Sequence, residues 1–142
     1  MDEQERRGIE ADCAKLMIRS VHLLDRRRYE PLTELFGEEG EWVRGGTAYR
    51  GFDAIMGSLN ERAPDMLIRH ILTTIDVTVQ GPEAAEGLGY FLVYKASGDG
   101  KTEPALPAPL TAATMVAEMQ DTYRKVEGDW RIARRETARI FD

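Results

Sequence analysis

The chain has 142 residues, of which 42% are hydrophobic and 31% are charged. This size and composition are typical of one globular domain and exclude a disordered chain. A net charge of −6 disfavours a nucleic-acid partner, because the phosphate backbone is itself anionic. We therefore expect a single domain over residues 1–142.

Metal-binding and targeting signals are scarce. Cys13 is the only cysteine, and His22 and His70 are the only histidines, so a zinc site rich in Cys and His is excluded. No phosphate-binding loop or dinucleotide fingerprint occurs, and we expect no metal and no cofactor. The polar segment 1–7 lacks the apolar core of a signal peptide, and no apolar run is long enough to span a membrane. These features predict a cytoplasmic protein.

The first half of the chain has helical periodicity. Apolar residues recur at helical spacing in the first helix, which we expect from about Glu5 to Arg28. Cys13 falls within that apolar stripe, where a thiol is a small buried hydrophobe rather than a nucleophile. The remaining expected elements are a short helix, a two-stranded hairpin and a third helix, namely Pro31 to Phe36, Glu41 to Arg44 with Thr47 to Arg50, and Phe52 to Arg62.

The second half contains four long β-type segments, which are Leu67 to Gln80, Ala84 to Ala96, Ala112 to Val126 and Trp130 to Phe141. Between the second and third lies Ser97 to Thr111, which is too long for a hairpin turn and is either mobile or a functional flap. Helices followed by an antiparallel meander predict an α+β domain, with three helices packed on a curved antiparallel sheet.

The first long strand is apolar on both of its faces. One face carries Ile68, His70, Leu72 and Thr74, and the other carries Ile71, Ile75, Val77 and Val79. Both faces need cover. One face fits the core and a pocket, and the other predicts a homodimer through the outer face of the sheet. The alternative is that long loops cover this face.

Several short motifs, taken in their order along the chain, resemble SnoaL-like proteins of the nuclear transport factor 2-like superfamily. They are Leu24-Asp25, Tyr29 to Phe36, Glu39 to Trp42, Tyr49 to Gly51, His70 and Trp130 to Arg135. The resemblance implies a cone in which a bent sheet and three helices enclose a pocket. The superfamily includes scytalone dehydratase, hexachlorocyclohexane dehydrochlorinase, ketosteroid isomerase, polyketide cyclases and the small subunits of ring-hydroxylating dioxygenases, so the fold by itself leaves the function open.

Within the dehydratase and dehydrochlorinase branch, the resemblance implies that Asp25 and His70 form the catalytic pair. Helix geometry places Asp25 at the margin of the apolar stripe, where it either reaches into the pocket or lies in solvent. His70, in an apolar strand, is either a base or a buried core residue. The chain departs from the branch in two ways. An Asn commonly follows the histidine by four positions, and here that residue is Thr74. Scytalone dehydratase uses a further histidine in the pocket, whereas the only other histidine here, His22, lies on the first helix.

The resemblance also places Trp42 and Arg135 at positions that often line the cavity. Tyr49, Tyr90 and Tyr94 are further candidates for aromatic pocket walls, or else plain core residues. If Arg135 points inward, it is suited to bind a carbonyl or carboxylate; if it points outward, it forms a surface ion pair.

Three classes of function fit these residues. The first is a cofactor-independent lyase, of the dehydratase type, or an isomerase that acts on a small hydrophobic carbonyl or cyclic substrate. Here neutral His70 removes a proton from carbon while Asp25 holds the other ring N–H. The second is a non-catalytic domain of the same fold that binds a small hydrophobic ligand. The third is an assembly role like that of the dioxygenase small subunits. The first is our working hypothesis.

Overall fold

Three helices and six strands make up the fold in the computed structural model, which describes residues 1–142. The helices are α1 (Glu3–Asp25), α2 (Tyr29–Phe36) and α3 (Gly51–Leu59). The strands are β1 (Glu41–Arg44), β2 (Thr47–Arg50), β3 (Met66–Gly81), β4 (Ala84–Ser97), β5 (Met115–Val126) and β6 (Asp129–Phe141). The predicted α+β class, element types and element order are confirmed.

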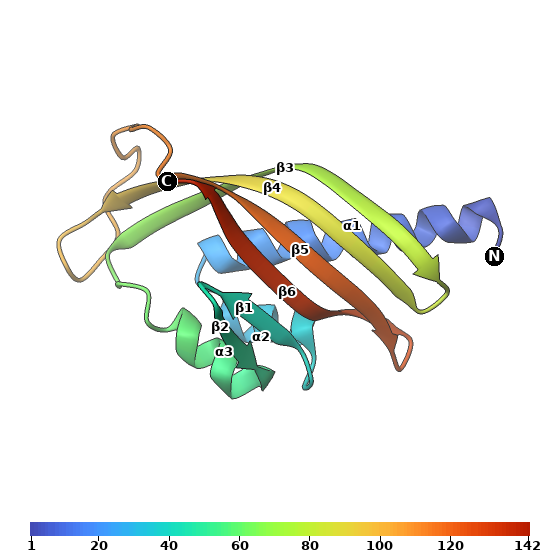
Figure 1. Cartoon of the computed structure of the whole chain (residues 1–142). Coiled ribbons are helices and arrows are strands. Elements are labelled where there is room, and N and C mark those ends of the chain that lie inside the picture. The colour runs from blue at the N-terminus through green and yellow to red at the C-terminus, as the bar shows by residue number, and fades with distance from the viewer.

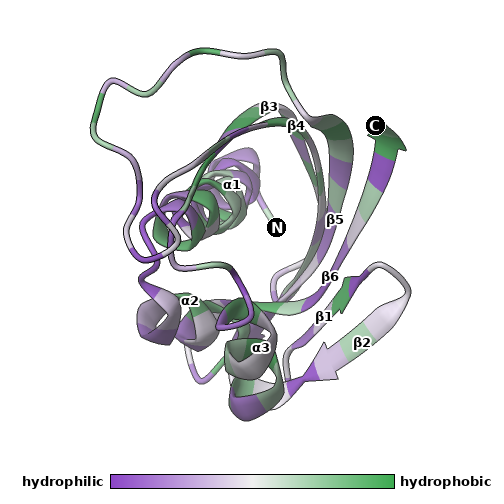
Figure 2. Cartoon of the chain, turned by 90° about the vertical axis from the view of Figure 1, so that its left-hand side faces the viewer, coloured by the Kyte–Doolittle hydropathy of each residue, from purple (hydrophilic) through white to green (hydrophobic).

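The strands form one sheet in the order β2-β1-β6-β5-β4-β3. All neighbours are antiparallel except β1 and β6, which run parallel. The long strands β3 to β6 curve around α1, and the smaller elements α2, α3, β1 and β2 lie on the other side of the interior (Figures 1 and 2). This curvature gives the domain its cone shape and leaves β3 as an edge strand close to α1.

Helix α1 is bounded by clear local signals. The Asp2 carboxylate accepts the backbone N–H of Glu5 at 2.7 Å, and the Glu5 side chain accepts that of Asp2 at 2.9 Å, which forms a capping box. The sequence predicts that the helix ends at Arg28, but it ends at Asp25, because Arg27 has a φ of 59°. A residue in the left-handed region cannot continue a right-handed helix.

A β-bulge interrupts β3. Thr73 pairs with Tyr90 and Asp76 pairs with Leu88, so β3 uses three steps where β4 uses two. Thr74, within the bulge, has a φ of 56°. One extra residue shifts the alternation of side chains, so each residue beyond the bulge occupies the face opposite to the one that simple counting predicts.

The bulge corrects the prediction that β3 is apolar on both faces. Ile68 and Leu72, before the bulge, pack against the same buried cluster as Ile75, within it, and Val77, after it, packs against the neighbouring cluster. The outer face of β3 keeps Ile71, which is 48% exposed. The prediction that the outer face of β3 is apolar along its whole length was therefore wrong, and the homodimer remains a prediction.

The strain at the bulge is testable. Thr74→Gly is expected to raise the free energy of unfolding by about 0.5–1 kcal/mol. A β-branched residue at positive φ costs about 1–2 kcal/mol, which exceeds the entropy that glycine adds to the unfolded chain. Thr73→Gly, at the adjacent exposed position with an ordinary φ, is the control and is expected to destabilise the fold. Urea unfolding measures both, and a loss of stability in Thr74→Gly would contradict the account.

Two glycines mark the crowded inner face of β4. A Cβ on Gly89 would lie 2.7 Å from Met17 Sδ, and a Cβ on Gly87 would lie 2.8 Å from the Tyr123 hydroxyl. Glycine is therefore required where α1 and β5 approach β4. Because alternate residues share a face, the same alternation carries Phe91 and Val93 into the interior, where both are buried.

The fold buries Cys13 completely. Burial, followed by the nearby charges of Asp12 and Asp121, raises the pKa of its thiol to about 12. The thiol is therefore protonated at neutral pH and acts as a small core residue, as predicted. None of the helices is long and apolar enough to cross a membrane.

Candidate active site

A cavity of about 700 Å³ lies within the cone. Its apolar wall comes from β4 and β5 and includes Phe91, Val93, Met115, Ala117 and Met119. Its polar wall includes Tyr29 at the start of α2, Trp42 and Arg44 on β1, Tyr49 on β2, Ser58 on α3, and His70 on β3. The volume and the mixture of apolar surface with a few polar groups are typical of a small-molecule site.

Asp25 and His70 meet at the junction of α1 and β3. Asp25 Oδ1 lies 2.5 Å from His70 Nδ1, and Asp25 Oδ2 accepts the backbone N–H of His70 at 2.8 Å. The backbone N–H is available because β3 is an edge strand. Asp25 is 5% exposed, and these two donors offset the unfavourable position of a carboxylate at the C-terminal end of a helix.

This geometry determines the tautomer of His70 when the ring is neutral. A carboxylate only accepts hydrogen bonds, so the proton lies on Nδ1 and Nε2 keeps its lone pair. The ring lines the cavity and packs at 5.3 Å, between centroids, against Phe91. An imidazole held in this way is suited to accept a proton through Nε2.

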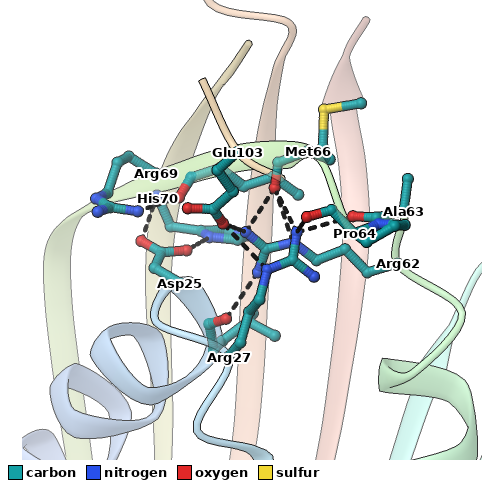
Figure 3. A network of polar contacts seen from close by, with 11 residues as sticks. Asp25, Arg27, Arg62, Ala63, Pro64, Met66, Arg69, His70 and Glu103 are labelled. Carbon is teal, nitrogen blue, oxygen red and sulfur yellow. Dashed lines mark hydrogen bonds and ion pairs between the residues drawn. The ribbon is translucent and has the colours of Figure 1, made fainter. Parts of the chain in front are cut away.

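A second polar network lies beside the pair (Figure 3). Arg62 lines the cavity, donates to the Leu24 and Met66 carbonyls at 2.9 Å each, and lies 3.4 Å from a Glu103 carboxylate oxygen. Arg27 donates to the Met66 carbonyl at 2.8 Å and to the same Glu103 oxygen at 3.0 Å. Glu103 belongs to the segment between β4 and β5, so at this point that segment is tied to the residues that follow α1 and to the loop that precedes β3.

The structure divides the predicted aromatic pocket residues into two groups. Trp42 and Tyr49 line the cavity. Tyr90 and Tyr94 do not line it, which corrects the prediction. Both alternate with the glycines of β4 and so point to the outer face, where Tyr90 is 40% exposed. Tyr94 instead lines a small outer hollow with residues 108–111.

Arg135 points inward but does not line the cavity, which corrects a second prediction. Its guanidinium donates to both oxygens of Asp121, at 2.7 and 2.8 Å, and the Tyr123 hydroxyl donates to the same carboxylate at 3.0 Å. Arg135 and Asp121 are 1% and 3% exposed. Burial, and then the Asp121 charge, raise the pKa of Tyr123, so its hydroxyl stays protonated. Arg135 therefore forms a buried structural ion pair with Asp121 and does not line the cavity.

Sequence reasoning missed Tyr29 and Arg44. Tyr29 was part of the motif at the start of the second helix, but nothing in its spacing indicated that its hydroxyl would face a cavity. Arg44 lies two residues after Trp42 in β1, and the alternation of a strand places both on one face. That alternation was the available signal for Arg44.

The family of the chain follows from comparison with known proteins. The model of the SnoaL-like domain family matches residues 6–136. No curated protein matches the chain. A solved structure of an NTF2-like protein with a cystatin-like fold from Novosphingobium aromaticivorans is 26% identical, with a TM-score of 0.73, and the match covers 92% of this chain and 80% of that chain.

Two other similar structures belong to proteins with lyase names. A protein provisionally assigned as a scytalone dehydratase, also from Novosphingobium aromaticivorans, is 18% identical with a TM-score of 0.79, covering 99% of this chain and 89% of that chain. The hexachlorocyclohexane dehydrochlorinase LinA-type3 from Novosphingobium barchaimii is 16% identical with a TM-score of 0.77, covering 99% of this chain and 92% of that chain. At these identities the likeness concerns the fold. The match over residues 6–136 shows that the chain belongs to the SnoaL-like domain family, within the NTF2-like superfamily.

Proposed function

We propose that the protein is a cofactor-independent lyase or isomerase that acts on a small hydrophobic carbonyl or cyclic substrate. The observation that carries this proposal is the contact between Asp25 and the Nδ1 side of a histidine whose ring lines a cavity of about 700 Å³. Membership of a family whose fold is shared with proteins named as a dehydratase and a dehydrochlorinase supports the same class of reaction.

In the proposed reaction, His70 Nε2 takes a proton from a carbon next to the substrate carbonyl. Asp25 holds Nδ1–H, keeps the ring in the reactive tautomer and stabilises the imidazolium that forms. If a group X is bonded at the β carbon, the electron pair forms the new C=C bond and X departs with its own pair. A departing hydroxide takes the proton from the imidazolium and leaves as water. Without such a group, the proton returns to another carbon and the product is an isomer.

Trp42 and Tyr49, which line the cavity, are proposed to contact the substrate. The apolar wall from β4 and β5 favours a hydrophobic substrate body, because contact with it removes apolar surface from water. The apolar wall also keeps water away from one side of the transient carbanion, which strengthens the electrostatic interactions there.

Hydrogen exchange tests the proton-transfer step without knowledge of the leaving group. A panel of cyclic ketones, beginning with 2-tetralone, and of β-hydroxy ketones is incubated with the protein in D₂O, and NMR follows the loss of the C–H signal. Exchange faster than in buffer is expected for the wild type but not for His70→Ala. His22→Ala, which alters an exposed histidine on α1, is the matched control and is expected to retain exchange.

Undiminished exchange in His70→Ala would remove the base from the proposal. Absence of exchange across the whole panel, together with ligand binding, would favour the non-catalytic binding domain instead.

We also propose that the protein forms a homodimer through the outer sheet face. An apolar row crosses four strands there, because Ile71 pairs with Leu92, Leu92 with Val116, and Val116 with Phe141. Ile71 and Phe141 are 48% and 68% exposed, and covering them removes apolar surface from water.

Sedimentation is expected to give a dimer mass for the wild type and a monomer mass for Ile71→Lys. A Thr78→Lys variant, on the same face but away from the apolar row, is expected to remain dimeric. A monomeric wild type would refute the dimer, and a stable dimer would count against an assembly role that needs a larger partner to cover this face.

A further inference from the structure

Arg62 joins the two elements that carry the Asp25–His70 pair. It lies in the loop between α3 and β3, and its guanidinium donates to the Leu24 carbonyl at 2.9 Å and, through Nε and Nη2, to the Met66 carbonyl at 3.3 and 2.9 Å (Figure 3). Leu24 directly precedes Asp25 in the last turn of α1. Met66 begins β3, four positions before His70. One side chain therefore links α1 to β3 beside the contact between the carboxylate and the ring.

The last turn of α1 depends on links of this kind. The final carbonyls of a helix have no intrahelical partner, so the end of a helix opens easily. Helix α1 itself makes two hydrogen bonds to β3, and both join Asp25 to His70. The guanidinium of Arg62 adds a bridge that does not depend on this pair. A cation at this position is also favourable, because it complements the negative end of the helix dipole.

Arg62 is itself fixed by its neighbours. Its side chain is 10% exposed, and its Nη2 lies 3.4 Å from Glu103 Oε1. The same oxygen accepts a hydrogen bond from Arg27 Nε at 3.0 Å, and Arg27 also donates to the Met66 carbonyl at 2.8 Å. Two guanidinium groups therefore converge on one carboxylate, whose charge offsets their mutual repulsion. Because Nε, Nη1 and Nη2 of Arg62 all have protein partners, the side chain is better suited to link elements than to bind a substrate.

We infer that Arg62, fixed by Glu103, is a positioning residue that keeps the Asp25 carboxylate on the Nδ1 side of His70. Its effect on the reaction rests on the proposed function, whereas its effect on the geometry of the pair does not. Without the link, the end of α1 gains freedom relative to β3, and the carboxylate leaves hydrogen-bond distance of the ring. The neutral imidazole then changes tautomer more readily, and Nε2 is less often free to accept a proton. A displacement of about 1 Å costs about 10²-fold in rate.

Proton and nitrogen NMR of the ligand-free protein test the positioning directly. The His70 ring of the wild type is expected to carry its proton on Nδ1, with a far-downfield signal that exchanges slowly with water and is absent from His70→Ala. Arg62→Met keeps most of the side-chain stem but removes the donors, and it is expected to weaken this signal and to populate the other tautomer. Arg62→Lys keeps the charge and a donor, and it is expected to restore part of the signal.

Arg26→Met is the matched control. It removes a cation from the exposed residue that follows Asp25, so it measures the effect of charge without loss of the link, and it is expected to keep the wild-type signal. If Arg62→Met does not fold, Glu103→Ala replaces it as the decisive variant. Glu103→Ala releases the guanidinium by a change at a side chain that is 33% exposed, and it is also expected to weaken the signal. A wild-type signal in the decisive variant, or an equal loss in Arg26→Met, would overturn the inference.

Hydrogen exchange with 2-tetralone separates this inference from the proposed function. Arg62→Met is expected to lower the exchange rate at saturating ketone about 10²-fold, while the dissociation constant of the ketone, measured by competition with a fluorescent hydrophobic dye, stays unchanged. If His70→Ala exchanges like the wild type but Arg62→Met loses the Nδ1–H signal, the positioning stands and the base falls. If His70→Ala abolishes exchange while Arg62→Met keeps both the signal and the rate, the base stands and the positioning falls.

Discussion

Asp25→Asn is expected to lower the rate of enzyme-dependent hydrogen exchange by about 10³–10⁴-fold with little change in ligand affinity. The amide cannot reproduce the arrangement in which one carboxylate accepts both the backbone N–H and the Nδ1–H of His70. The imidazole then loses its preference for the tautomer with a free Nε2, and the imidazolium loses its counter-charge. Removal of an orienting carboxylate from a catalytic histidine has an effect of this size.

The exchange rate at saturating 2-tetralone and the dissociation constant of the ketone separate these two quantities. Asp12→Asn, an exposed acid on the same helix, is the control and is expected to behave as the wild type. Circular dichroism establishes whether each variant is folded. A folded Asp25→Asn protein with wild-type exchange would show that the carboxylate has a structural role only.

The largest effect on stability is expected from Arg135→Met, which should lower the free energy of unfolding by about 3–5 kcal/mol. It leaves the Asp121 carboxylate, which is 3% exposed, without the two hydrogen bonds that the guanidinium donates at 2.7 and 2.8 Å. Removal of one partner from a buried pair has this cost because a buried charge is left uncompensated. A domain of this kind has only about 5–15 kcal/mol of net stability.

A triple variant separates the charge effect from packing. Replacing Asp121 by Leu, Tyr123 by Phe and Arg135 by Met together removes every polar group of this network, so no buried charge remains. We expect this protein to recover most of the lost stability, because an apolar replacement of a buried ion pair is often neutral. Urea unfolding compares the three proteins. A loss below about 1 kcal/mol in Arg135→Met would contradict the role assigned to the pair.

Arg135 does not line the cavity, so it is not placed to bind a ligand there. An arginine already bound to a carboxylate by two hydrogen bonds has little capacity left for a ligand. Arg44, whose hydrogen bond goes to the neutral Ser58 hydroxyl, lines the cavity instead. Arg44 on β1 is therefore one of the cationic residues that line the cavity, together with Arg62, Lys95 and Arg139.

Local patterns in the sequence determined the elements of this protein. Helical spacing located α1, glycine and proline marked the turns, and the strands β1 and β2 were predicted at their observed bounds, Glu41–Arg44 and Thr47–Arg50. These features depend on interactions between residues close in sequence, so periodicity and turn chemistry suffice to detect them. The order of helices and strands then gave the fold class. Pairing of Asp25 with His70, 45 residues apart, was expected only through the family resemblance.

Only the tertiary structure decided which side chains meet. The bulge at Thr74 reversed the faces of the second half of β3, and no composition or simple alternation signals an extra residue in a strand. The partner of Arg135 was decided by the register of β5 and β6, in which Asp121 stands opposite to it. Tyr29 on α2 and Trp42 on β1 both line the cavity, although 13 residues separate them in the sequence. Contacts between distant segments depend on strand register and packing, which short-range patterns do not encode.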